Sequence, residues 1–258
     1  MTTYNLSGYI GSIPGYKHFS DYVQDGLVLG WDGIENAGVG THASLLSALY
    51  DHSGNGYYGT TLSAEIFNNG FYLNGPGARI YNDSADKVLS ALTDIEMTVE
   101  VVFGRMVWDN DQRYTIWSTS TPNEWNSSAR AYPIGNQTPF YAIWKQTYNT
   151  VPEGARLQIK NSSQMMTLTI VGQPRAISYY ANGTFVSTTT LDNDTPNGHI
   201  NPTFRIGGVG GGGSTIPMVN MNFHCARVYN RILTPAEIAH NRKVDVARFN
   251  IQTQVASG

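Results

Sequence analysis

The chain has 258 residues, of which only 14% are charged, and its formal net charge is −3. This length is compatible with one all-β domain, while 41% hydrophobic residues and 27 glycines supply a core and many turns. The slightly acidic balance, without a basic run, argues against nucleic acid as a partner, and no apolar run approaches the roughly 20 residues that span a bilayer.

The first 25 residues show no helical period, and we interpret residues 1–25 as an N-terminal arm. Such an arm either drapes over its own domain or orders on a partner. Met1–Ile10 contains no basic residue and no apolar stretch of signal-peptide length, so we expect a protein made in a cytoplasm. The single cysteine, Cys225, excludes an intramolecular disulfide framework, so the core must supply the stability.

From Leu27 onward, short runs rich in Val, Ile, Tyr and Phe alternate with clusters of Gly, Asn, Asp and Pro, which is typical of strands joined by turns. Asn182 and Gly183, between two β-prone runs, predict a tight hairpin. The predicted strands are Gly26–Trp31, Gly70–Asn74, Ile95–Phe103, Tyr114–Ser118, Phe140–Lys145, Ala155–Lys160, Met166–Val171 and Ala176–Tyr180.

One stretch near the C-terminus has the pattern of a helix. Thr234 is a hydroxyl N-cap, Pro235 takes the first helical position, and Glu237 completes a capping box, so we expect a helix over Pro235–Val246. One short helix on a β chain predicts an all-β fold of two packed sheets. We expect one domain over residues 26–250, with a tail over residues 251–258.

Several segments, in chain order, resemble the laminin-G-like, concanavalin-A-like jelly-roll family. They are Leu49–Gly56 with Gly59 and Thr60, Phe71–Gly75, Met97–Phe103, Tyr179–Gly183, Phe204–Gly208 and, most specifically, Ala226–Ile238. The resemblance covers about residues 27–249 and implies a two-sheet antiparallel jelly-roll sandwich with one short C-terminal helix. Gly26–Asn36 is also similar to copies of this domain in proteins of bacterial viruses and gut bacteria.

The strongest enzymatic pattern is Glu96 and Glu100, because enzymes of this fold that cleave β-glucans carry a similar Glu-x-Asp-x-Glu strand. Here Thr98 replaces the middle Asp. Retaining hydrolysis needs two carboxyl groups about 5 to 5.5 Å apart, whereas Cα atoms four residues apart on a strand are about 13 Å apart. We therefore interpret both glutamates as polar residues on the open face of a sheet and predict that the chain is not an enzyme.

Two segments offer oxygen ligands in loops, Asp109 to Asp111 and Asp192 to Asp194, and laminin-G relatives can hold Ca²⁺ at a loop rim. Neither completes a calcium-binding loop, so we interpret both as turns, expect no metal or other cofactor, and keep Ca²⁺ as the alternative. The context of Cys225 predicts a strand with a buried thiol rather than a metal ligand or a nucleophile.

Sugar rings stack on exposed Trp and Tyr, while Asn, Asp and Glu hydrogen-bond to their hydroxyl groups. Trp125 is the favoured contact because its segment is hard to bury, whereas core packing is the alternative for Trp144. A tyrosine-rich interface between subunits gives the same composition. The candidate ligand-binding residues are Trp108, Asp109, Asp111, Trp125, Tyr141 and Trp144.

The resemblance, together with the absence of a complete set of catalytic residues, predicts a non-catalytic surface protein of a bacterial virus. Such a protein would be a capsid decoration, a head fibre or a tail-associated protein. Its jelly roll would bind host or mucosal glycans. Expected partners are other virion proteins, reached through the arm, and further copies of the chain in a homo-oligomer. The expected location is the virion. The alternatives are a bacterial cell-surface or secreted carbohydrate-binding module, and a glucanase-like hydrolase.

Overall fold

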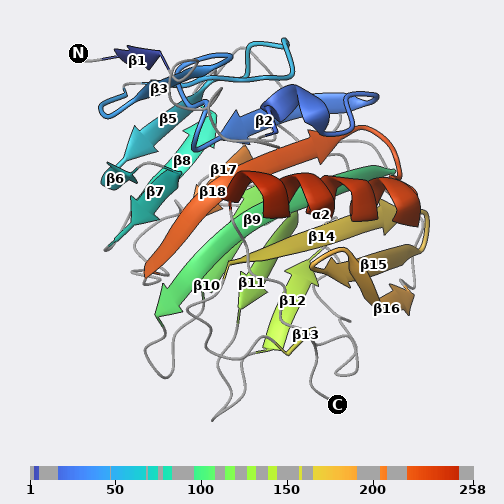
Figure 1. The fold of residues 1–258 in the computed structure, drawn as a ribbon. Helices are drawn as coiled ribbons and strands as arrows, with labels where there is room; N and C mark the ends of the chain where they lie inside the picture. Colours follow the sequence, from blue (N-terminus) through green and yellow to red (C-terminus); the bar gives the residue numbers. More distant parts are fainter. Residues whose placement is uncertain are drawn as a thin grey trace.

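The computed structural model places two antiparallel sheets against each other and the C-terminal α-helix on the outside (Figure 1). The predicted fold, an all-β jelly-roll sandwich with one C-terminal helix, is confirmed. The structure describes residues 3–5, 17–46, 48–67, 69–74, 78–82, 96–107, 114–119, 127–131, 139–143, 157–158, 165–190, 204–207 and 220–249.

We call the first layer sheet I, and its strand order is β13-β12-β11-β10-β17-β8-β5-β4. Neighbouring strands are antiparallel throughout this order. In chain order its strands are β4 (Ala48–Leu49), β5 (Gly59–Leu62), β8 (Arg79–Asn82), β10 (Tyr114–Thr119), β11 (Ser127–Ala131), β12 (Pro139–Ile143), β13 (Leu157–Gln158) and β17 (Phe204–Gly207).

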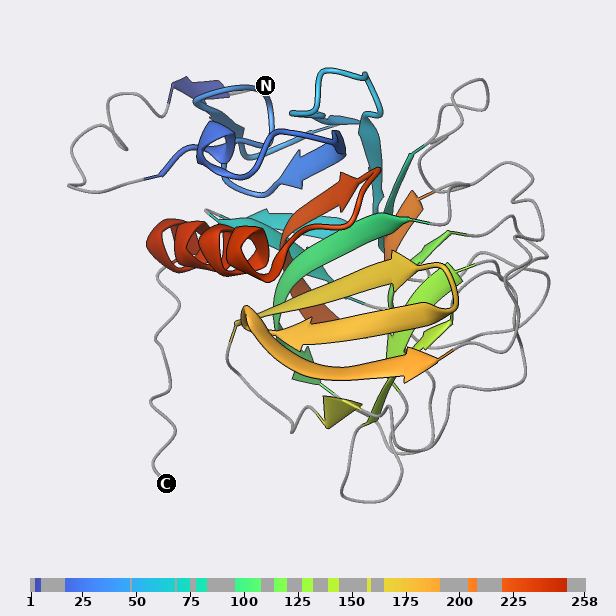
Figure 2. The ribbon, with the colours of Figure 1, turned by 90° about the vertical axis from the view of Figure 1, so that its right-hand side faces the viewer.

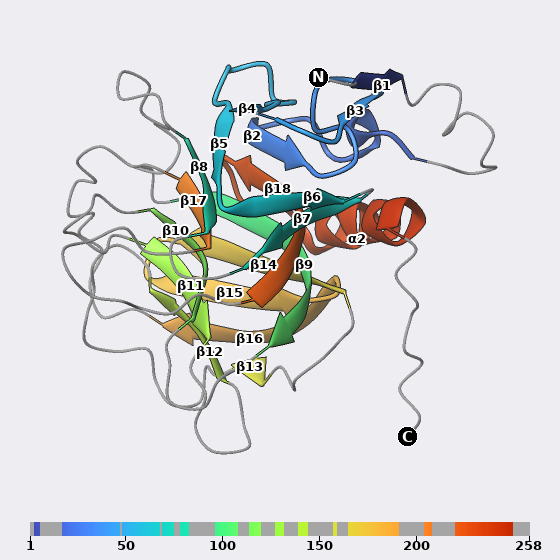
Figure 3. The ribbon, with the colours of Figure 1, turned by 90° about the vertical axis from the view of Figure 1, so that its left-hand side faces the viewer.

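The second layer, sheet II, has the order β16-β15-β14-β9-β18-β7-β6, and β2 pairs with β18 beside it. Its strands are β2 (Leu27–Asp32), β6 (Ala64–Phe67), β7 (Gly70–Leu73), β9 (Met97–Val107), β14 (Met166–Gln173), β15 (Ala176–Ala181), β16 (Thr184–Thr190) and β18 (Asn220–Tyr229). The remaining elements are β1 (Thr3–Asn5), β3 (Thr41–Ala43), the 3-10 helix η1 (Phe19–Asp21) and α2 (Pro235–Phe249). Figures 2 and 3 show α2 on the side of sheet II that faces away from sheet I.

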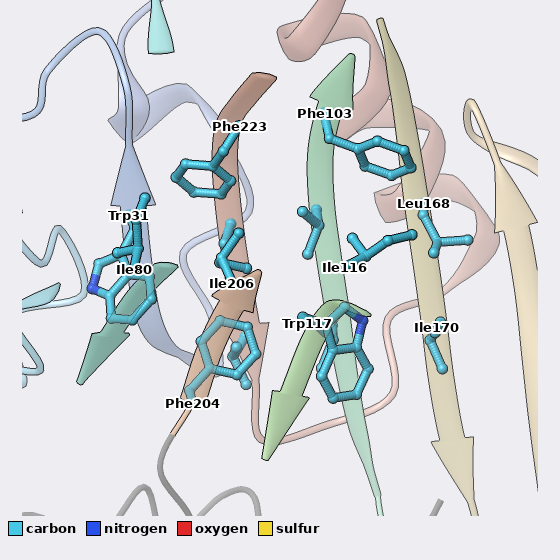
Figure 4. Close-up of a cluster of buried hydrophobic side chains, with 14 of the residues drawn as sticks. Trp31, Ile80, Phe103, Ile116, Trp117, Leu168, Ile170, Phe204, Ile206 and Phe223 are labelled. Carbon is cyan, nitrogen blue, oxygen red and sulfur yellow. The ribbon is translucent and has the colours of Figure 1, made fainter. Parts of the chain in front are cut away.

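The main core fills the space between the two sheets (Figure 4). Every second residue of β9 enters this core, namely Met97, Val99, Val101 and Phe103. A core of such side chains contributes roughly 1.5–3 kcal/mol for each large apolar residue removed from water. Large aromatic members from other strands are Trp31, Phe71, Trp117, Phe204 and Phe223.

A second apolar cluster lies between sheet II and α2. The helix contributes Ile238, Val244 and Phe249 to this cluster. It ends at Phe249, three residues beyond the predicted end at Val246. Its predicted capping box is confirmed: the Glu237 N–H donates to Thr234 Oγ1 at 3.3 Å, and the Thr234 N–H donates to Glu237 Oε2 at 2.8 Å. The cap therefore fixes where the chain enters the helix that covers this face.

The described part of the predicted arm packs with the domain. Phe19 and Tyr22 are 1% and 2% exposed and belong to the cluster beneath α2. Residues 17–25 thus contribute to the second core. No helix in the described ranges is long and apolar enough to cross a membrane.

The predicted hairpin turn has the expected local geometry, and a second turn follows Leu49. Asn182 and Gly183 have φ of 51° and 78°, the left-handed conformations of a tight hairpin turn, and they join β15 to β16. In the segment that follows Leu49, Asp51 accepts backbone N–H hydrogen bonds from Gly30, Ser53 and Tyr57 at 2.8–3.0 Å. Asp51 therefore ties this turn to β2.

Candidate functional site

Of the six predicted ligand-binding residues, only Tyr141 belongs to the described part of the chain. It lies in β12, where its Cα is paired with that of Arg130 in β11. Whether these six residues contact a ligand stays a prediction. The five that lie outside the described residues are Trp108, Asp109, Asp111, Trp125 and Trp144.

The segments that carry the candidate residues are attached to the ends of strands β10, β11 and β12, and the strand register shows which end each one joins. Thr119 and Ile143 lie at one end of this meander. The segment with Trp125 follows Thr119 in the chain, and Trp144 follows Ile143 directly. The segment that precedes β10 joins it at Tyr114, at the opposite end and about 17 Å away for five residue steps. The topology therefore attaches the candidates to both ends of the sheet.

A row of paired residues crosses sheet I and includes Arg205, Tyr81 and Thr60. Arg205 of β17 pairs with Tyr81 of β8, and Tyr81 pairs with Thr60 of β5. The chain neighbours Ile80 and Ile206 are fully buried between the sheets. Because side chains alternate along a strand, Tyr81 and Arg205 lie on the face of sheet I that points away from the core.

Arg79 belongs to the same outer face, two residues before Tyr81 on β8. Its guanidinium carbon lies 5.0 Å from the centre of the Tyr81 ring. Arg205 is opposite Tyr81, so Arg79 is the diagonal neighbour of Arg205, a spacing of about 7–8 Å in an antiparallel pair. Burial lowers the pKa of Arg205, and the positive charge of Arg79 lowers it further. We call Arg79, Tyr81 and Arg205 the outer-face cluster.

The sequence pattern alone does not identify the outer-face cluster. The sequence does contain a local sign of it. Polar or amphipathic residues alternate with apolar ones in Arg79-Ile80-Tyr81 and Phe204-Arg205-Ile206, which indicates strands with one face towards the core. Local pattern does not say that β8 pairs with β17, because these strands are far apart in the chain. The pairing therefore needed the three-dimensional structure.

The predicted carboxylate pair, Glu96 and Glu100, does not form a shared site. Glu96 is exposed and precedes β9, whereas Glu100 is 1% exposed beneath α2. The Glu100 carboxylate accepts hydrogen bonds from Arg227 Nε at 2.9 Å and from Asn241 Nδ2 at 2.7 Å. The expected open polar face is therefore wrong at Glu100, because α2 covers this face and Glu100 is used inside the protein.

Arg227 joins Glu100 to Asp245 of α2 in a buried ionic network. Its guanidinium donates to Asp245 at 2.8 and 3.2 Å and lies 3.9 Å from the centre of the Tyr22 ring. Burial raises the pKa of Glu100, and the charge of Arg227 opposes that rise. The Tyr22 hydroxyl donates to Asp245 at 2.8 Å. These groups satisfy one another and fix α2 and residues 17–25 to sheet II, where a ligand does not reach them.

No group of three His, Cys, Asp or Glu side chains in the described ranges could hold a metal ion. The two calcium candidates, Asp109 to Asp111 and Asp192 to Asp194, lie outside these ranges. Cys225 lies in β18 with a fully buried thiol, as the sequence predicts. Burial raises the pKa of this thiol far above its usual range, which suits a core residue and not a nucleophile.

The fold is similar to domains in solved structures of carbohydrate complexes. A sialidase of Trypanosoma rangeli bound to sialic acid matches with a TM-score of 0.63 and 15% identity, over 86% of this chain and 34% of the sialidase. The binding domain of botulinum neurotoxin DC bound to SialylT matches with a TM-score of 0.55 and 16% identity, over 85% of this chain and 52% of that chain.

The same toxin domain bound to rat synaptotagmin II matches with a TM-score of 0.57 and 16% identity, over 86% of this chain and 52% of that one. The chain thus spans about a third of the sialidase and about half of the toxin domain. No protein-family model matches the chain, and no curated protein does either. At these identities, the likeness establishes a β-sandwich fold alone.

The prediction that the chain is not an enzyme is corrected by this comparison. The solved structures that share the fold include sialidases, which are enzymes, at 15–16% identity. The prediction rested on a missing catalytic motif, but a fold of this kind carries unrelated sites, and their residues need not follow one pattern. Neither an absent motif nor the fold is therefore a reason to exclude catalysis.

Proposed function

We propose that the chain is a glycan-binding β-sandwich domain. The observation that carries the proposal is the fold likeness to proteins solved with sialic acid and with SialylT, over 85–86% of the chain. The outer-face cluster gives further support, because two cationic forks and a phenol ring lie on the sheet face that α2 does not cover. Sugar sites combine such aromatic surfaces with a few well-placed polar groups.

A glycan array probed with the fluorescently labelled full chain tests this proposal. We expect signal on a restricted set of related glycans, and we expect Trp125→Ala to lower it if Trp125 contacts the sugar. Tyr58→Ala is the matched control, because Tyr58 is a half-exposed aromatic residue outside both candidate sites. Uniform background on every glycan would contradict the proposal, whereas unchanged binding by Trp125→Ala would refute only the assigned contact.

We further propose that the domain belongs to the laminin-G-like, concanavalin-A-like group and is displayed on the surface of a bacterial virus. The support is the similarity of Gly26–Asn36 and of Ala226–Ile238 to that group. In this proposal the chain forms a homo-oligomer, and the N-terminal arm attaches it to other virion proteins.

The mass in solution of the full chain, compared with a variant that lacks residues 1–16, tests the assembly. The deletion stops before Phe19 and Tyr22, because both are buried in the domain. We expect an oligomer that becomes a monomer without the arm. A monomer in both cases would contradict the virion assembly and favour a bacterial cell-surface or secreted carbohydrate-binding module.

A further inference from the structure

We propose that the outer-face cluster of Arg79, Tyr81 and Arg205 binds the carboxylate of an acidic sugar. This inference rests on the proposed glycan binding and adds the chemical class of the ligand. The shared chemistry is a pyranose ring that bears a carboxylate, which both sialic acids and uronic acids provide.

The three side chains come from two adjacent, paired strands. Arg205 is opposite Tyr81 in the register, and Arg79 is opposite Gly207, so both arginines flank the same phenol ring. The Arg79 guanidinium carbon lies 5.0 Å from the ring centre, within the range of a cation–π contact. Groups on paired strands hold their spacing better than groups on loops, so the cluster is preorganised, with Arg79 and Tyr81 partly exposed and Arg205 9% exposed beside them.

The electrostatics of the cluster favour an anion. Arg79 and Arg205 occupy diagonal positions on paired strands, where residues are about 7–8 Å apart, and the chain as a whole has a net charge of −3, so this pair of positive residues is a local feature. The lowered pKa of Arg205, due to burial and then to Arg79, shows that each charge raises the cost of the other. A carboxylate between them offsets this repulsion.

The geometry of the donors suits a carboxylate in particular. A guanidinium presents five N–H donors in a planar fork that matches the two oxygens of a carboxylate, and this fork serves more than one acceptor at a time. Both arginines have further interactions within the chain. The hydroxyl of Tyr81 donates or accepts a hydrogen bond, as sugar hydroxyl groups require.

Buried arginines on the opposite side of the molecule illustrate the contrast. Arg227 and Arg248 form ion pairs at 2.8 Å with Asp245 and at 2.7 Å with Asp32, and all four side chains are fully buried. Those cations are enclosed by the protein. In the outer-face cluster, by contrast, Arg79 is only half-buried, and its positive charge lowers the pKa of Arg205 after burial does.

Calorimetric titration of the full chain with paired sugars tests the inference. The pairs are 3′-sialyllactose with lactose and glucuronic acid with glucose, so each differs by a carboxylate-bearing group. We expect the acidic member of at least one pair to bind about tenfold or more tightly, and we expect Arg79→Gln to remove that preference. The pair that shows the preference identifies the class of acidic sugar.

Two further variants separate the effect of net charge from that of the guanidinium fork. Lys243→Gln removes one positive charge from an exposed position on α2 and should leave the preference intact. Arg79→Lys keeps the charge but loses the fork, so it should retain only part of the preference. Thermal unfolding of each variant verifies that it is folded.

The outcomes separate this inference from the proposed function. Equal binding of acidic and neutral sugars, or a preference that Arg79→Gln leaves unchanged, would overturn the carboxylate site while glycan binding stands. Failure of every sugar here, together with an array without signal, would overturn both.

Discussion

Replacing Arg227 with methionine probes the contact that holds α2 to the sandwich. Methionine keeps much of the side-chain volume, so the change mainly removes the positive charge between Glu100 and Asp245. Removing one partner of a fully buried ion pair costs about 3–5 kcal/mol, because the remaining charges stay uncompensated. Against a usual stability of about 5–15 kcal/mol, this loss is large. The melting temperature should fall by roughly 6–20 °C, at about 2–4 °C per kcal/mol.

The effect of pH gives this prediction a second readout. Burial already raises the pKa of Glu100, and without Arg227 nothing comparable opposes that rise. A group with a raised pKa in the folded state contributes stability that is lost as the pH rises through that pKa. The Arg227→Met variant should therefore recover part of its unfolding free energy as the pH falls from 7 towards 5.

Urea unfolding monitored by tryptophan fluorescence measures both quantities. The matched control is Arg231→Met, because Arg231 forms an ion pair with Glu237 in which both side chains are partly exposed, at 27% and 28%. Such a pair contributes about 1 kcal/mol or less. A loss below about 1 kcal/mol in Arg227→Met, or a loss that grows on acidification, would refute the role assigned to this network.

Two further predictions concern buried titratable groups near the same network. Burial lowers the pKa of His224 from its usual value of 6.5 to about 4, so the unfolded chain takes up a proton at higher pH than the folded one. This residue should therefore lower the unfolding free energy by about 3 kcal/mol between pH 6.5 and pH 4. His224→Asn should make the unfolding free energy less dependent on pH over this range. An unchanged pH dependence in His224→Asn would contradict the lowered pKa of His224. The Cys225 thiol is fully buried with a strongly raised pKa, so it should not react with a disulfide reagent at pH 8 until the chain unfolds; fast reaction of the folded protein would show that β18 is less protected than the structure indicates.

Local patterns in the sequence predict much of the fold. The alternation in β9 identifies the residues that enter the main core, and Thr234 with Glu237 marks the start of α2. Asn182 and Gly183 identify the hairpin between β15 and β16. These signals succeed because each depends on residues within a few positions of one another, where backbone geometry is decided locally.

The functional surfaces depend on contacts that the local pattern does not contain. Glu100 alternates with apolar residues as a solvent-facing residue would, and only the placement of α2 shows that it is buried beside Arg227. Arg79 and Arg205 come together because β8 pairs with β17, a long-range choice made by the topology of the sheet. The six predicted ligand-binding residues are aromatic residues and aspartates of predicted loops and strands, and such local features do not reveal which strands pair.

Locating the bound sugar shows whether a glycan binds on the outer face of sheet I. Titrating ¹⁵N-labelled full chain with 3′-sialyllactose while following backbone amide shifts gives that location. We expect amide shift changes that saturate and centre on Arg79, Tyr81 and Arg205, with little effect on α2. Saturating changes confined to α2 and the segment around Tyr22, or no change at any amide, would contradict this expectation.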